Sequence, residues 1–138
     1  MIRAARPTDQ AFVASSWSLS MTRSNRRNKD SAAYRMLVDS TLDHPSVRVA
    51  IACDPDDTDR IIGWLVYTQI ASMLILHYAF VREKERRKGI ARAMVDFANV
   101  PTATQVVYTF EGPSTNKLKA TALRNLIRIQ PATFLERR

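Results

Sequence analysis

Residues 73–98 read MLILHYAFVREKERRKGIARAMVDFA, and this stretch decides the fold. Its first part, which ends at Val81, is rich in β-branched, aliphatic and aromatic residues, a composition typical of a buried strand. A short charged segment follows. Apolar residues then recur with helical spacing at Ile90, Met94, Val95 and Ala98. The stretch therefore predicts a strand, a cationic turn and an amphipathic helix in direct succession.

The turn between the strand and the helix has the composition of an anion site. It reads Arg86-Arg87-Lys88-Gly89-Ile90-Ala91, so a glycine and a small residue stand at the helix start. Such a turn directs successive backbone N–H groups, and the positive end of the helix, towards one place. We therefore expect a polyanion there, and a phosphate or pyrophosphate fits best. The alternative is a solvated basic turn that only connects two elements.

Arg86-x-x-Gly89-x-Ala91 resembles the R/Q-x-x-G-x-G/A signature of the GCN5-related N-acetyltransferase family, and Ala79-Phe80-Val81 is similar to the lead-in of that signature. The motif lies directly after an apolar strand and before an amphipathic helix, which is the context it requires. The resemblance implies acetyl-CoA as co-substrate, bound through its pyrophosphate and its pantetheine arm. The cofactor-binding residues that it implies are Phe80, Val81, Arg86, Arg87, Lys88, Gly89, Ile90 and Ala91.

The remaining sequence alternates between strand and helix patterns. We expect strands over residues 2–6, 47–53, 61–69 and 105–110, helices from Pro7 and over 31–42, and a polar turn at 54–59. Helical spacing recurs from Leu118 to Ile129, and 132–135 can add a strand. The order is similar to that of the acetyltransferase family over about residues 2 to 110. It implies one α/β (α+β) domain over residues 1–138, with a mixed, largely antiparallel sheet flanked by helices.

Composition limits the classes of protein that fit. The chain has 138 residues, 46% of them hydrophobic, which is enough for the core of one domain. The single cysteine, Cys53, excludes an intramolecular disulfide and a Cys-rich zinc site, so we expect no metal and a reducing compartment. Neither a membrane-length apolar run nor a signal-peptide pattern is present, which favours a cytoplasmic protein. The net charge of +8 favours an anionic partner.

The resemblance implies transfer of an acetyl group from acetyl-CoA to an amine by direct attack in a ternary complex. His77 is the candidate general base, because it is the only side chain within the motif strand that titrates near neutral pH. The alternative is a structural strand histidine. Family members commonly use a tyrosine in the helix after the fifth strand as general acid. This chain has Asn116 but no tyrosine after Tyr108, so the resemblance is incomplete where the chemistry occurs.

A different class of function fits the same charge. A catalytically silent module with this fold could contact nucleic acid through its basic residues. The residues that would do so are Arg82, Lys84, Arg86, Arg87, Lys88 and Arg92, with Arg23, Arg26, Arg27 and the basic C-terminal segment. No helix-turn-helix or zinc-finger pattern accompanies them, which favours the acetyltransferase reading. The amine acceptor itself has no signature in the sequence.

Overall fold

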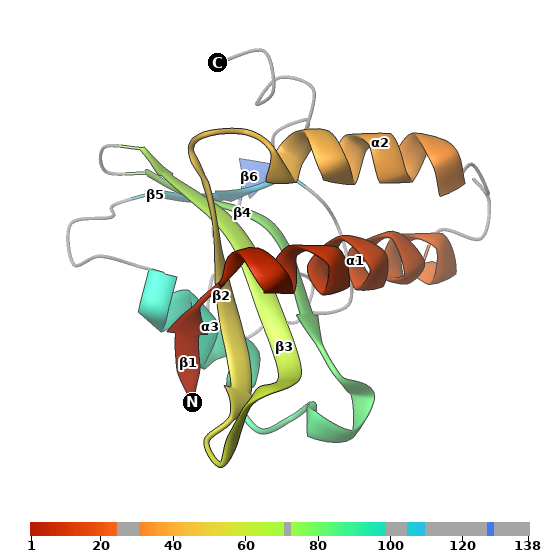
Figure 1. The fold of residues 1–138 in the computed structure, drawn as a ribbon. Helices are drawn as coiled ribbons and strands as arrows, with labels where there is room; N and C mark the ends of the chain where they lie inside the picture. The colour runs from red at the N-terminus through yellow and green to blue at the C-terminus, as the bar shows by residue number, and fades with distance from the viewer. Residues whose placement is uncertain (25–30, 71–72, 99–104, 110–126, 129–138) are drawn as a thin grey trace.

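The strands of a computed structural model of the chain form one mixed sheet of six strands in the order β1-β2-β3-β4-β5-β6 (Figure 1). The structure describes residues 1–24, 31–70, 73–98, 105–109 and 127–128. Strands β1 to β4 are antiparallel neighbours, and β5 and β6 join the sheet in parallel. No helix among these residues is long and apolar enough to cross a membrane.

The elements follow the predicted order. Their bounds are β1 Ile2–Ala4, η1 Pro7–Asp9, α1 Gln10–Ser24, α2 Ser31–Leu42, β2 Val47–Asp54, β3 Asp57–Ile70, β4 Met73–Val81, η2 Glu83–Glu85, α3 Ile90–Ala98, β5 Gln105–Tyr108 and β6 Ile127–Arg128. The predicted sheet class, the motif strand and the motif helix are confirmed.

Two segments differ from the expectation. The β2–β3 turn is shorter than 54–59, because Asp54 accepts a hydrogen bond from the backbone N–H of Asp56 at 2.9 Å and closes the chain within a few residues. Helical spacing suggested a helix as far as Ile129, but Ile127 lies opposite Val107 in a parallel pair with β5 and is a strand residue. The rest of that helix and the strand expected at 132–135 lie outside the described residues.

Helices cover both faces of the sheet. On one face, α1 and α2 enclose an aromatic group in which Trp17, Trp64 and Tyr78 lie with ring centroids 5.7–5.8 Å apart. On the opposite face, Met94 and Val95 of α3 pack against the strands. The motif helix is therefore anchored by its apolar stripe, as the spacing predicted, and its first turn is held at a fixed place beside the end of β4.

Gly63 allows β3 and β4 to approach closely near the end of the motif strand. A Cβ atom built at this position would lie 2.7 Å from the backbone oxygen of Phe80, which is closer than side chains tolerate. Backbone cannot rotate away as a flexible side chain can, so the strands themselves would have to move apart.

Gly63→Ala should therefore lower the free energy of unfolding by about 1–3 kcal/mol, the usual cost of overpacking. Urea denaturation of the wild-type and variant proteins measures this difference. An alanine variant with the same urea midpoint, and the same dependence of the unfolding free energy on urea concentration, would contradict the packing argument.

Candidate functional site

The second half of β4 has a strand on one side only within the described residues. Pairing with β3 continues to Val81, but pairing with β5 covers only Met73 to Leu76. A last link follows, in which the N–H of Thr109 donates to the carbonyl of Leu76 at 3.0 Å. Beyond Leu76, β4 therefore presents an edge that is unpaired in the described part of the chain. We call residues 79–81 of this side the outer edge of β4.

The hydrogen-bond pattern shows which groups face the outer edge. The N–H of Arg82 donates to the carbonyl of Ile62 at 2.9 Å, so these two residues form a hydrogen-bonded pair. Such pairs alternate along an antiparallel ladder, and no register shift separates this pair from Phe80. The backbone groups of Phe80 therefore point towards β3, and those of Ala79 and Val81 point towards the outer edge.

This geometry changes the expected pairing with a ligand. Phe80 was predicted to bind the cofactor, but its N–H faces β3 and its ring stacks on Trp64 with centroids 5.6 Å apart. Val81 faces outwards, an orientation compatible with its predicted part in cofactor binding. Ala79, which was not among the predicted site residues, presents the second outward N–H. The sequence shows that the backbone groups of successive strand residues point to opposite sides. It does not show which of the two alternating sets faces β3 and which faces the outer edge.

The turn after β4 is fixed to the strand by Arg86. Its Nε donates to the carbonyl of Val81 at 3.0 Å, so the guanidinium holds the turn against the strand end. Two residues of the turn have left-handed backbone, Arg87 with φ 68° and Gly89 with φ 74°. A Cβ atom at Gly89 would meet no atom within 4 Å, so this side of the turn opens onto free space.

The start of α3 adds polar groups at the same place. The first bond into the helix runs from the N–H of Ala93 to the carbonyl of Gly89 at 3.0 Å. The N–H groups of Ile90 and Ala91 precede it and have no acceptor within the helix. These N–H groups, which have no acceptor within the helix, create positive potential at the helix N-terminus, and the open space at Gly89 gives an anion access to it.

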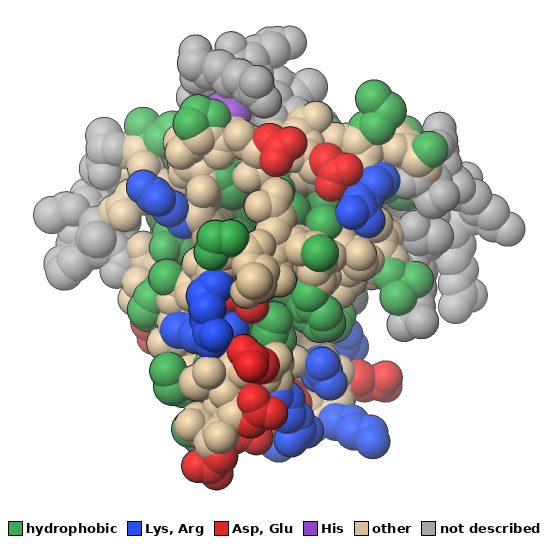
Figure 2. Space-filling view, viewed as in Figure 1, with side chains coloured by type: hydrophobic (Ala, Val, Ile, Leu, Met, Phe, Trp, Pro, Cys, Tyr) green, Lys and Arg blue, Asp and Glu red, His purple; other side chains and the backbone are tan. Residues whose placement is uncertain are grey.

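The basic residues of the segment do not act as one cationic surface. Lys88 Nζ lies 2.9 Å from Glu85 Oε2, a hydrogen bond that lowers the pKa of Glu85, and Arg92 Nε lies 3.4 Å from Asp96 Oδ1. Basic and acidic side chains also alternate over the lower half of the face in Figure 2. Within the described ranges, Lys84 and Arg87 have no ion-pair partner. Arg23 lies near the end of α1, and residues 26 and 27 lie outside the described ranges.

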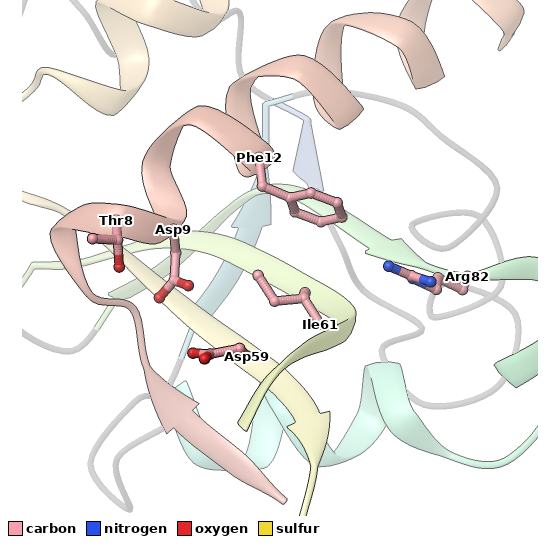
Figure 3. A pocket seen from close by; sticks show the side chains of 6 residues that line it. All are labelled: Thr8, Asp9, Phe12, Asp59, Ile61 and Arg82. Atoms are coloured by element: carbon pink, nitrogen blue, oxygen red, sulfur yellow. The ribbon is translucent and has the colours of Figure 1, made fainter. Parts of the chain in front are cut away.

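A hollow of about 550 Å³ lies where β4 ends, on the face of the sheet that carries α1 (Figure 3). Its lining is Thr8, Asp9, Phe12, Asp59, Ile61 and Arg82. The carboxylates are already engaged, because Asp9 accepts from Arg3 at 2.8 Å and Asp59 from Arg6 at 3.2 Å. The Arg82 guanidinium stands over the Phe12 ring, 6.0 Å from its centroid. The sequence carries no signal for this hollow, since its residues come from separate elements.

His77, the predicted general base, lies in the core with 1% of its surface exposed. Its Nε2 is 2.9 Å from the hydroxyl of Thr68 and its Nδ1 is 3.0 Å from the hydroxyl of Thr109. Burial lowers the pKa of the ring to about 3, and the charge of His44 acts in the same direction. A base must reach the proton that it accepts. These contacts favour the structural alternative, and we do not assign His77 the role of base.

The pKa of His77 makes a prediction about stability. Below its ordinary pKa of 6.5 the unfolded chain gains a proton on this ring, whereas the folded ring stays neutral down to about 3. Between these two values the unfolded state binds more protons than the folded state. The contribution of His77 to the free energy of unfolding is therefore fully present above about pH 6.5 and is lost as the pH falls towards 3. This group alone should remove about 2 kcal/mol between about pH 7 and about pH 5.

Urea denaturation at the two pH values tests this, with His77→Gln as the comparison because glutamine can hydrogen-bond but does not titrate. The free energy of unfolding changes with pH in both proteins, and the difference between the two changes is the contribution of His77 alone. Parallel pH profiles for the two proteins would show that the ring is not held neutral in the folded state.

No protein-family model matches the chain, and no curated protein matches its sequence significantly. Solved structures match its fold. A possible acetyltransferase from Clostridium difficile 630 superposes with a TM-score of 0.62 at 17% identity, over 94% of this chain and 91% of that chain. The ribosomal-protein-alanine N-acetyltransferase from Brucella melitensis biovar Abortus 2308 gives 0.58 at 16%, over 88% and 91%. AAC(6')-Iy, in complex with the bisubstrate analogue CoA-S-monomethyl-acetylneamine, gives 0.56 at 14%, over 91% and 89%. The chain therefore has the fold of the GCN5-related N-acetyltransferases, as the motif at 86–91 predicted.

Proposed function

We propose that the protein transfers an acetyl group from acetyl-CoA to an amine. The observation that carries this proposal is the continuity of two binding features. The outward N–H groups of Ala79 and Val81 lead directly into the turn at Gly89 and the first turn of α3. An extended ligand with amide groups at one end and a pyrophosphate at the other matches that succession of groups. The CoA analogue bound by AAC(6')-Iy, a protein of the same fold, supports the choice of ligand.

Different residues would bind different parts of acetyl-CoA. Ala79 and Val81 would pair with the amides of the pantetheine arm. Gly89, Ile90 and Ala91 would receive the pyrophosphate through their N–H groups. Arg87 and Lys88, which are exposed at the turn, would add charge, and Arg86 would keep the turn against β4 through the Val81 carbonyl. The open space at Gly89 is what a ligand of this kind needs, because a side chain there would occupy it.

Acetyl-CoA supplies an already activated acyl group, so the demands on the protein are modest. An N–H group fixed at the strand edge can polarise the acetyl carbonyl, and such a donor needs no reorganisation during the reaction. The acceptor amine must be neutral when it attacks. The amine nitrogen forms the new bond to the acetyl carbon, the C–S bond breaks, and CoA leaves as its thiolate. His77 is buried and the sequence has no tyrosine after Tyr108, so we assign to water both the removal of the proton from the amine and the protonation of the thiolate.

Acetyl-CoA should raise the melting temperature of the wild-type protein, because a ligand that binds only the folded state stabilises it. Gly89→Val should abolish this shift, since its side chain enters the space that the pyrophosphate needs. Gly89→Ala is the matched control. Both variants carry a side chain at φ 74°, which costs about 1–2 kcal/mol, but alanine adds little bulk.

The expected order of affinity is wild type, then alanine, then valine, measured by calorimetry at a temperature where all three are folded. Release of free thiol from acetyl-CoA in the presence of an amine panel then measures turnover. A valine variant that binds acetyl-CoA as tightly as the wild type would contradict the turn assignment. Tight binding without acetylation of any amine would identify a silent binding module.

Arg87→Ala should weaken acetyl-CoA binding by about 1 kcal/mol, the size of one partly exposed charge contact. Arg35→Ala is the control, because Arg35 pairs with Asp39 on the exposed side of α2, away from the turn. The affinity of each protein is measured at two salt concentrations. A nucleic-acid-binding module would instead show a steep salt dependence with a short DNA duplex, reduced by Arg87→Ala, and no binding of acetyl-CoA.

A further inference from the structure

β4 breaks its register with β3 once, at His77. Val66 lies opposite Tyr78, and Tyr67 lies opposite Leu76, so His77 is the extra residue of a β-bulge. The bulge reverses the alternation of side chains. Before it, Leu74 and Leu76 pack on the α3 side of the sheet, and after it Ala79 and Val81 pack there, with Tyr78 and Phe80 on the α1 side.

The imidazole of His77 joins three strands at this bulge. It bonds Thr68 of β3 and Thr109 directly after β5, and both threonines are 0% exposed. A neutral imidazole has one donor and one acceptor, and a hydroxyl can serve as either, so both ring nitrogens are satisfied in either tautomer. We call Thr68, His77 and Thr109 the clasp.

The clasp lies where the pairing of β4 with β5 ends in the described residues. Leu76 opposite Tyr108 is the last β4–β5 pair in the described residues, and the outer edge begins two residues beyond His77. Loss of the bulge would slip the register by one residue and turn every later side chain and backbone amide of β4 to the other side. It would also leave a buried imidazole without its partners, which is costly. The hydrogen bonds to these two hydroxyls therefore favour the bulged register, and with it the observed direction of the later amides.

We propose that His77 is a positioning residue, and that the clasp sets the direction of the Ala79 and Val81 N–H groups at which the acyl donor binds. The part that concerns the donor rests on the proposed function. The part that concerns the strand edge does not, because the direction of those amides is a property of the free protein.

The test removes one hydroxyl at a time. Thr68→Val and Thr109→Val keep the side-chain shape and delete one bond to the ring. Thr41→Val is the matched control, since Thr41 is as buried (1% exposed) but its hydroxyl bonds the carbonyl of Leu37 within α2 at 2.8 Å. Thr109→Ser restores the hydroxyl and should rescue the effect. Acetyl-CoA affinity is measured by calorimetry and the Ala79 and Val81 amide resonances by NMR, at a temperature where every variant is folded.

The clasp variants should bind acetyl-CoA roughly tenfold more weakly than the wild type and move both amide resonances. Thr41→Val should lose stability and change neither measurement. Affinity and resonances that are equal in clasp and control variants would overturn the proposal, and so would failure of Thr109→Ser to restore them. If the wild type does not bind acetyl-CoA, the proposed function is wrong, and the amide resonances still decide whether the clasp directs the edge.

Discussion

A strand keeps its side chains on alternate faces only while its register holds, and β4 changes its register with β3 once, at His77. Its first half is paired on both sides, with β3 and β5, whereas its second half keeps only β3 among the described residues. The bulge at His77 accommodates the change, and the buried hydrogen bonds to Thr68 and Thr109 hold it there. Both the aromatic packing against α1 and the outward amides of Ala79 and Val81 depend on this one adjustment.

The site at the end of β4 relies on backbone more than on side-chain charge. Lys88 and Arg92 are each paired with an acid within their own segment, and the Arg86 guanidinium is held by the Val81 carbonyl. Such exposed pairs contribute little stability, but they reduce the charge that is left for a ligand. Among the described residues, the exposed Arg87 keeps its charge unpaired, and beside it the N–H groups of the turn and of the first turn of α3 remain for a ligand. Under the proposed function, a strongly basic segment would therefore bind a small-molecule anion mainly through its backbone.

Local and non-local features differed in how well the sequence predicted them. The motif strand, the turn and α3 were predicted because their signals are local: apolar composition, a glycine and helical spacing within one stretch. The bulge was not predicted, because it is defined by the pairing with β3, and its hydrogen-bond partners Thr68 and Thr109 lie 9 and 32 residues away from His77 in the chain. The same limit explains why Phe80 was predicted to face the ligand and Ala79 was not. Which amides face outwards follows from the register with β3, and no single strand encodes that register.

Under the proposed function, the burial of His77 means that catalysis would not use this side chain as a base. A ring that is held neutral by burial and bonded at both nitrogens cannot collect a proton from an amine outside the core. A thioester, however, needs no protein nucleophile, and orientation of the two reactants supplies a large part of the rate enhancement. The outward amides can stabilise the charge that develops on the carbonyl oxygen. With orientation and amide donors as the contribution of the protein, the pH dependence of turnover would follow the fraction of acceptor amine that is neutral. The pKa of the acceptor, and not that of His77, would then set the working range of the enzyme.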